Sequence, residues 1–434
     1  MPDFARSAVL QRKIQEHKDG RASGICSVCS TNRSVLEAAM QWDRDSNQLL
    51  LIESTCNQVN QNGGYTGLTP AAFTGYIQDI SDKNGFPTER IFLGGDHLGP
   101  NPWKHESSSS AMAKAEQLVR DYVAAGYRKI HLDASMLCGG DTALSNKEIA
   151  ERTVRLCKQA ESAIDFQKND CLPLYVIGTD VPKPGGLSAQ GNDGIHVSTV
   201  LDVKETIDAF RAAFIKHGLE KAWNRTIAIV VSPGVEFGDR EVYWYERERN
   251  RDMKDFIETV PGLVFEAHST DYQPPILLRQ MVEDHFAILK VGPALTFAYR
   301  EALFNLAAIE NEMPTINHFA HSGLKEVLMK IMLADPSHWR EHYCGSPEEI
   351  AFSLKYSFND RIRYYWGDPV VRNAVEKLIN NLRNVPIPLA LISQYFPASF
   401  ALVRDQQIKP DPVTLIQATI LRVLEDYRFA CEPD

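Results

Sequence analysis

The feature that most constrains this sequence of 434 residues is a repeated unit. A short apolar run is followed by a polar turn and then by a segment with helical periodicity. The apolar runs are at 24–30, 48–55, 90–96, 129–135, 173–180, 226–234, 262–269 and 286–293. Strands that are apolar on both faces and alternate with helices form parallel sheets. Eight such units predict an α/β protein with a closed (β/α)8 TIM barrel rather than an open doubly wound sheet.

The alternation stops at about residue 314, and the remaining segments have helical periodicity. These segments are 321–334, 346–366, 369–384 and 412–430. We therefore expect a barrel with an N-terminal helix over residues 1–313 and a helical extension packed on the barrel over 314–434. The helix that should follow the sixth strand is the least clear, because it lies somewhere in the charged stretch 241–260.

Charge and composition exclude several classes of protein. A formal net charge of −10 argues against nucleic-acid binding, which needs a basic face. The charged N-terminus has no apolar core typical of a signal peptide, and no apolar stretch approaches the ~18–20 residues that span a bilayer. The eight cysteines are scattered, and we interpret the Cys26/Cys29 pair as core residues. A cytoplasmic location, without membrane attachment, fits best.

Reactive side chains follow most of the predicted strands. Active sites of this barrel type lie at the C-terminal ends of the strands. The third strand runs into Asp96 and His97 through two glycines, in GGDHLG. The other candidates at strand ends are Asn57, Gln58, Asn60, His131, Asp133, Ser135, Asp180, Glu236, Glu266, His268, Ser269, Asp271 and Lys290. Their convergence predicts one site at this end of the barrel.

Two histidines on different strands, together with carboxylates, can hold a divalent cation with an open position for substrate. Such an ion polarises a carbonyl, and a carboxylate such as Asp96 could move a proton at an adjacent hydroxyl. This combination favours retro-aldol cleavage or epimerisation of a ketose. We interpret His131 as a hydrogen-bonded core residue, and Lys290 as a charge partner or anion ligand rather than a Schiff-base lysine. His196 and Asp193 remain alternative metal ligands.

At these residues the sequence resembles a known family. Its motifs are GGDHLGPNPW, STCNQVNQNGGYTG, KIHLDASM, VPKPGG, PGVEFG, FEAHSTDYQ, KVGPALTFAYREALF and SFNDRIRYYW, which span about residues 24 to 366. Together they resemble the non-catalytic GatZ/KbaZ subunits of tagatose-1,6-bisphosphate aldolase. That family is in turn similar to the metal-dependent class II ketose-bisphosphate aldolases, which are (β/α)8 barrels.

The class II resemblance implies individual roles. Asp96 corresponds to the acid/base, and His97 and His268 correspond to metal ligands. The third histidine ligand is missing, because the sixth strand offers GVEF, where Glu236 could substitute. Gly292 stands where class II enzymes have an asparagine near the substrate. We expect a divalent metal as the cofactor, with zinc first and manganese or magnesium as alternatives, and Asp133, a buried carboxylate at a strand end, as a second catalytic residue. In the extension, Arg361 and Arg363 are candidates to reach a phosphate.

Three functions follow from these expectations. The first is metal-dependent retro-aldol cleavage or C4 epimerisation of a ketohexose phosphate. The second is a non-catalytic role, in which the chain stabilises a separate class II tagatose-bisphosphate aldolase subunit. The third is the tagatose-6-phosphate kinase activity with which family members have been labelled, although the sequence has no GxxxxGK[ST] loop. We expect a homo-oligomer in addition to any partner aldolase.

Overall fold

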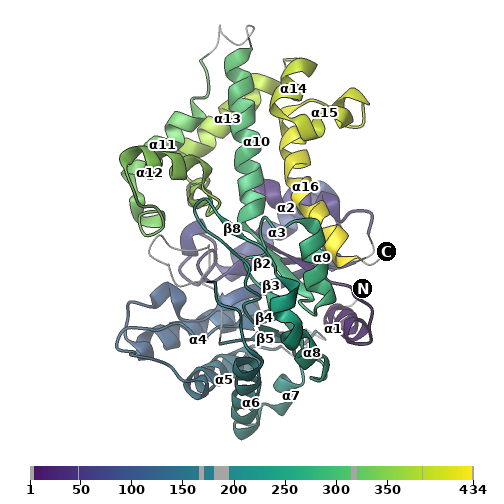
Figure 1. The fold of residues 1–434 in the computed structure, drawn as a ribbon. Coiled ribbons are helices and arrows are strands. Elements are labelled where there is room, and N and C mark those ends of the chain that lie inside the picture. Colours follow the sequence, from purple (N-terminus) through teal and green to yellow (C-terminus); the bar gives the residue numbers. More distant parts are fainter. Residues whose placement is uncertain are drawn as a thin grey trace.

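The computed structural model describes residues 4–46, 48–165, 171–179, 195–313, 320–383 and 385–432. Eight parallel strands form a closed barrel in the order β1-β10-β9-β6-β5-β4-β3-β2 (Figure 1). They are β1 (Ile25–Cys29), β2 (Leu50–Thr55), β3 (Ile91–Leu98), β4 (Lys129–Leu132), β5 (Leu174–Ile177), β6 (Thr226–Val230), β9 (Val264–Ala267) and β10 (Ile288–Val291). Each begins within a segment that the sequence predicts as a strand, and the TIM-barrel prediction is confirmed.

The helices of the barrel layer begin at capping side chains. Asn32, Thr69 and Ser107 accept hydrogen bonds from backbone N–H groups in the first turns of α2, α3 and α4, and Ser145 and Thr199 form capping boxes with Glu148 and Asp202. The helices are α1 (Phe4–Lys18), α2 (Arg33–Trp42), α3 (Pro70–Asn84), α4 (Ser108–Ala124), α5 (Asn146–Ser162), α6 (Val200–Lys216), α7 (Glu220–Trp223), α8 (Arg251–Glu258), α9 (Pro275–Glu283) and α10 (Pro293–Glu312).

The stretch 241–260 folds in a more complex way than a single helix. β7 (Glu236–Phe237) and β8 (Val242–Tyr243) pair in antiparallel fashion after β6, and a short 3-10 helix at Arg247–Asn250 precedes α8. The interruption explains why helical periodicity is hard to detect here.

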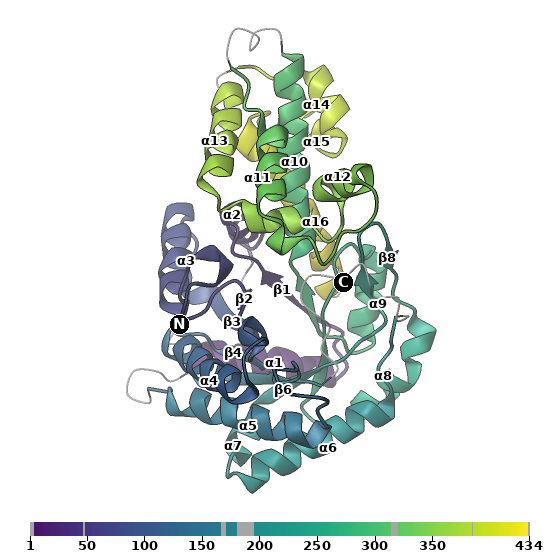
Figure 2. The same cartoon turned by 90° about the vertical axis from the view of Figure 1, so that its left-hand side faces the viewer.

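One end of the barrel interior is filled by apolar side chains. Leu10 and Ile14 of α1 join a buried cluster with Leu51, Phe92 and Ile288 of the strands. In Figure 2, α1 lies behind the ring of strands. Since α1 and these apolar residues fill the barrel at the N-terminal ends of the strands, the polar side chains of the interior lie toward the C-terminal ends.

The extension continues along α10, which projects beyond the barrel (Figure 1). It contains α11 (Leu324–Ala334), α12 (Pro347–Tyr356), a 3-10 helix η6 (Arg361–Tyr365), α13 (Pro369–Arg383), α14 (Leu389–Tyr395), α15 (Pro397–Arg404) and α16 (Pro412–Cys431). The last helix, α16, returns to the barrel and packs against α2, α9 and α10. It therefore fills the position between α9 and α2 in the outer layer of helices.

The connection between α16 and the barrel is close. The backbone N–H of Gly24 donates to the carbonyl oxygen of Cys431, over 2.8 Å. A Cβ atom at Gly24 would lie 2.9 Å from Cys431 Sγ, so a larger residue there would push α16 away. None of the helices in the described ranges combines the length and apolar character that crossing a membrane requires.

Candidate functional site

A cavity of ≈ 580 Å³ opens at the C-terminal ends of the strands, between the barrel and the extension. Nine of the residues predicted for the site line it: Asn57, Gln58, Asp96, His97, His268, Ser269, Asp271, Lys290 and Arg363. The extension contributes residues of η6 and α13 to its wall. The predicted convergence of strand-end residues on one site is therefore what the structure shows.

Other predicted residues lie around this cavity without lining it. Asn60, Asp133, Glu236 and Glu266 are buried beside it, and Ser135 is partly buried. Arg361 points elsewhere, because its Nε donates to the carbonyl oxygen of His338 over 2.6 Å. Asp180 lies outside the described residues, as do Asp193 and the VPKPGG motif.

The floor of the cavity is a buried network of charges. Lys129 Nζ lies 2.7 Å from Glu53 Oε1 and 2.7 Å from Glu266 Oε2, and all three side chains are fully buried. Lys290 Nζ lies 2.8 Å from Glu53 Oε2 and 2.7 Å from Asp96 Oδ1. Glu53 and Lys129 were not predicted from the sequence. The sequence did contain a signal for both residues, because each is a charged residue in an otherwise apolar strand. Such a residue needs a buried partner of opposite charge.

The packing around Asp96 explains why glycine precedes it. A Cβ atom at Gly94 would lie 2.6 Å from Glu53 Cγ, so only glycine leaves room for the buried Glu53 carboxylate. The pairing of β3 with β4 becomes irregular between Gly95 and Leu98, and His97 has a positive φ of 49°. A local irregularity in a strand re-aims side chains, and positive φ in a non-glycine residue is strained. Both features place Asp96 and His97 at the cavity.

Three imidazole rings lie together above this floor. The ring centroids of His97 and His268 are 4.7 Å apart, and His131 lies 5.1 Å from His97 and 5.2 Å from His268. His97 Nδ1 lies 3.0 Å from Asp133 Oδ2, and Asp133 accepts a further hydrogen bond of 2.6 Å from Ser135 Oγ. Asp133 and Ser135 therefore orient His97.

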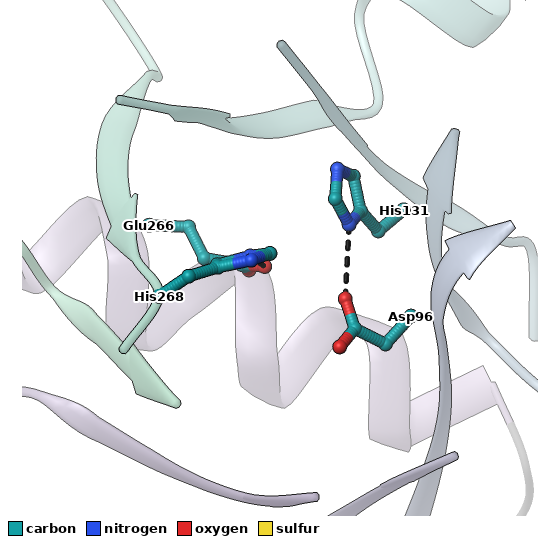
Figure 3. Close-up of side chains that lie close together, drawn as sticks. All are labelled: Asp96, His131, Glu266 and His268. Atoms are coloured by element: carbon teal, nitrogen blue, oxygen red, sulfur yellow. Dashed lines mark hydrogen bonds and ion pairs between the residues drawn. The ribbon is translucent and has the colours of Figure 1, made fainter. Parts of the chain in front are cut away.

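Four of these side chains could hold a metal ion. One ligand atom each from Asp96, His131, Glu266 and His268 lies within 4.8 Å of the others (Figure 3). The group differs from the ligands predicted from the sequence, since it shares His268 with them but contains neither His97 nor Glu236. Glu236 instead accepts a hydrogen bond of 3.0 Å from the backbone N–H of Phe237.

The group fits a divalent cation in two respects. His131 Nε2 is buried and has no hydrogen-bond partner among the described residues. In addition, the four carboxylates of Glu53, Asp96, Asp133 and Glu266 outnumber the cations that face them, which are the ammonium groups of Lys129 and Lys290 and the imidazole of His97. The resulting excess of one negative charge favours a bound cation, and zinc accepts both imidazole and carboxylate ligands.

Burial and neighbouring charges shift the pKa values in this site. Burial alone would raise the pKa of Asp96, but His97 and Lys290 hold that pKa well below its ordinary value. Burial would likewise lower the pKa of His97, and the carboxylates of Asp96 and Asp133 instead raise it. Burial lowers the pKa of His268 to about 4, which keeps that imidazole neutral. Asp96 is thus ionised at neutral pH, and His268 has a lone pair for a metal.

Comparisons with known proteins extend over nearly the whole chain. Residues 10–432 match the family described as D-tagatose-1,6-bisphosphate aldolase subunit GatZ/KbaZ-like. The chain is 47% identical over 427 residues to a Salmonella dublin protein and 46% identical over 426 residues to a Salmonella typhimurium protein. Both are named "D-tagatose-1,6-bisphosphate aldolase subunit GatZ", and each alignment covers 98% of this chain and 100% of the relative.

A solved structure shares the fold and much of the sequence. It is a protein from Sinorhizobium meliloti 1021 described as a "probable tagatose 6 phosphate kinase". It superposes with a TM-score of 0.86 at 44% sequence identity, covering 94% of this chain and 100% of that one.

Proposed function

Because the chain belongs to the D-tagatose-1,6-bisphosphate aldolase subunit GatZ/KbaZ-like family, as its motifs predicted, we propose that its barrel binds a divalent metal and acts on a ketohexose phosphate. The reaction is retro-aldol cleavage or epimerisation at C4. Zinc is the first candidate for the metal, and manganese or magnesium are alternatives. The proposal also includes a class II aldolase subunit as a partner, because the relatives are named as subunits.

The observation that carries this proposal is the unpartnered Nε2 atom of His131. His131 Nδ1 lies 3.0 Å from Asp96 Oδ1 and 3.2 Å from the backbone nitrogen of His97. Protonation of Nδ1 gives the stronger bond, because the acceptor is a carboxylate, although it leaves the backbone N–H of His97 without Nδ1 as its acceptor. That tautomer leaves a lone pair on Nε2, which is buried and has no hydrogen-bond partner among the described residues, in a side chain that groups with Asp96, Glu266 and His268. A buried acceptor without a donor is costly, and a metal ion would satisfy it.

The protein's own residues have distinct roles in this proposal. A bound divalent ion would supply Lewis-acid polarisation of the substrate carbonyl. With His131, Glu266 and His268 as the ligands of that ion, Asp96, which is ionised and lines the cavity, takes the proton from a substrate hydroxyl. His97, held by Asp133, supplies a positive charge and a proton beside it. Asn57, Gln58 and Ser269 offer hydrogen-bonding groups to the sugar hydroxyls, and Arg363, whose N–H groups bond to the chain itself, adds positive charge to the cavity wall.

A second candidate function is supported by Lys290. Its ammonium group lies within 3.6 Å of carboxylate oxygens of Glu53, Asp96 and Glu266, so it already compensates much of their charge. A network compensated in this way can persist as a structural element without a metal. The chain would then serve as the non-catalytic subunit that stabilises a separate class II aldolase.

The deciding experiment is ¹³C NMR of tagatose 6-phosphate and tagatose 1,6-bisphosphate incubated with the purified chain, with and without Zn²⁺ or Mn²⁺. We expect metal-dependent triose or epimer signals that vanish in Asp96→Asn. The matched control is Asp255→Asn, which makes the same change at an exposed position. Unchanged spectra with every metal, together with a higher rate or stability of an added class II aldolase subunit, would favour the second candidate.

A further inference from the structure

Barrels of this type often bind phosphate at one particular place in the active-site cavity. That place lies between the loops that follow the seventh and eighth strands, where backbone N–H groups at a helix N-terminus point at the anion. In this chain those strands are β9 and β10, and the helix is α10, which begins at Pro293. Gly292, Pro293 and Thr296 all line the cavity.

The anion position at this end is filled by the chain itself. Asp271 Oδ1 accepts hydrogen bonds from the backbone N–H groups of Gly292, over 3.0 Å, and Ala294, over 2.8 Å. Asp271 lines the cavity but is only 2% exposed. Its neighbours Ser269 and Tyr272 have positive φ values of 54° and 65°. The chain accepts this strain while holding a carboxylate where a phosphate would otherwise bind.

The remaining donors at the same end are also occupied. Thr296 Oγ1 donates to Asp360 Oδ2 over 2.5 Å, and Asp360 is buried with a positive φ of 44°. Arg363 Nη1 donates to the backbone carbonyl oxygens of Asn359 and Asp360. An arriving phosphate would therefore meet the buried carboxylates of Asp271 and Asp360 and no uncommitted backbone donor at the start of α10. The cations at this end are already committed, since Arg300 lies 3.9 Å from Asp360 and Arg363 is held by backbone carbonyl oxygens.

A cation is available on another part of the cavity wall. Arg372 of α13 lines the cavity and is exposed, and the described residues place no carboxylate within ion-pair distance of it. Arg33 also lines the cavity, but it is paired with Glu37 over 2.8 Å. The cavity therefore has two buried carboxylates at the start of α10, whereas on α13 Arg372 has no ion-pair partner among the described residues, although Glu376 lines the same wall.

We propose that Asp271 is a specificity-determining residue, which excludes a phosphate from the start of α10. The cavity then takes a ketose with a single phosphate, whose phosphate-free end faces Asp271 and whose phosphate is directed toward Arg372. This inference rests on the proposed function, because it concerns the substrate of the same site. A bisphosphate would bring a second anion against a desolvated carboxylate, and such like-charge contacts strongly disfavour a ligand.

Calorimetric titration of the full chain, loaded with Zn²⁺, with tagatose 6-phosphate and with tagatose 1,6-bisphosphate tests the inference at pH 7.5. We expect the monophosphate to bind about tenfold or more tightly than the bisphosphate. Asp271→Asn keeps an oxygen that can accept both hydrogen bonds but removes the charge, so it should bring the two affinities together. Asp271→Ser, which keeps a smaller neutral cap, should do the same. Arg372→Gln should weaken binding of the monophosphate.

The control is Asp411→Asn, which changes the N-cap carboxylate of α16 away from the cavity and should leave the affinity ratio unchanged. Equal or tighter binding of the bisphosphate by the unaltered chain would overturn the role of Asp271 while leaving the proposed function standing. The same holds for an unchanged ratio in both Asp271 variants. Failure of both sugars to bind would instead refute the proposed function, and the inference with it.

Discussion

Lys290 Nζ lies 2.7 Å from Asp96 Oδ1, so an ammonium group stands beside a carboxylate of the candidate metal site. His131 Nδ1 lies 3.0 Å from the same Asp96 oxygen. A divalent ion that uses Asp96 must therefore share this carboxylate with Lys290 or displace it. The relationship makes the lysine a competitor of the metal, and this competition can be measured.

Lys290→Met should increase the affinity for Zn²⁺ by about tenfold or more, because it removes a positive charge from a desolvated site. The stability of the metal-free chain should fall, since Glu53 and Asp96 lose a partner. Chelator competition measures the affinity, and thermal unfolding without metal measures the stability. Lys409→Met, at an exposed position, is the control. Unchanged affinity would show that Lys290 and the metal do not compete.

Lys129→Met should reduce the free energy of unfolding by about 3–5 kcal/mol, because it leaves Glu53 and Glu266 buried without their shared cation. Urea unfolding measures the loss. Adding Glu53→Gln to the same chain should recover part of it, since Lys290 then has one buried carboxylate fewer to compensate. A double variant as unstable as the sum of the two single changes would contradict this account.

His131→Asn should weaken zinc binding by at least about tenfold, whereas Glu236→Gln should leave it unchanged. The structure groups His131 with Asp96, Glu266 and His268, while Glu236 lies outside that group. Chelator competition on both variants, and on His97→Asn, distinguishes the two ligand sets. Loss of affinity in Glu236→Gln but not in His131→Asn would favour the set predicted from the sequence.

The burial of His17, far from the cavity, predicts that part of the free energy of unfolding is lost in acid. Its Nδ1 lies 2.9 Å from the carbonyl oxygen of Ser23 and its Nε2 lies 2.9 Å from His285 Nδ1. Burial lowers the pKa of His17 to about 4. Below pH ~6.5 the imidazole of His17 is therefore protonated in the unfolded chain, whereas in the folded chain it stays neutral down to pH ~4. Stability from this group is complete above pH ~6.5 and falls by up to about 3 kcal/mol as the pH drops to ~4.

Urea unfolding between pH 4.5 and 7.5 measures this component. The stability difference between the unaltered chain and His17→Gln should shrink as the pH falls through that window. His105→Gln, at an exposed position, makes the same change as a matched control. A difference for His17→Gln that does not vary with pH would argue against titration of His17.

Leu424→Ala should lower the free energy of unfolding by about 2–5 kcal/mol, because Leu424 of α16 is fully buried. Since α16 packs against barrel helices, we expect the whole chain to unfold at lower denaturant in a single transition. Circular dichroism and tryptophan fluorescence should give the same midpoint. Val413→Ala, also in α16 but 37% exposed, should change the midpoint little. Separate loss of the extension with an unchanged barrel would contradict this expectation.

The fold was predictable because its signal is local. Each strand is a short apolar run and each helix has its own periodicity and cap, so the count of eight units identifies the barrel. The strand ends that carry Asp96, His97, His268 and Lys290 follow directly, since parallel strands of a barrel end on the same side.

The contacts across the barrel were not predictable in the same way. Glu53 of β2, Lys129 of β4 and Glu266 of β9 meet only because of the tilt and stagger of the closed sheet, which no short stretch of sequence encodes. His131 illustrates the point, since a buried histidine in a strand has the same sequence pattern whether its Nε2 is bonded or free. The same holds for Arg361 and Arg363, which the sequence does not distinguish. The turn of η6 directs only Arg363 to the cavity.

The position of α16 between α9 and α2 has a consequence for biosynthesis. A ribosome makes the barrel strands first and the helix that completes their outer layer last. Until α16 emerges, the surfaces of α2, α9 and α10 that it covers stay exposed to solvent, and transiently exposed apolar surface promotes aggregation. The barrel therefore becomes complete only when translation has reached the final helix, and a premature stop codon within α16 should yield an insoluble product.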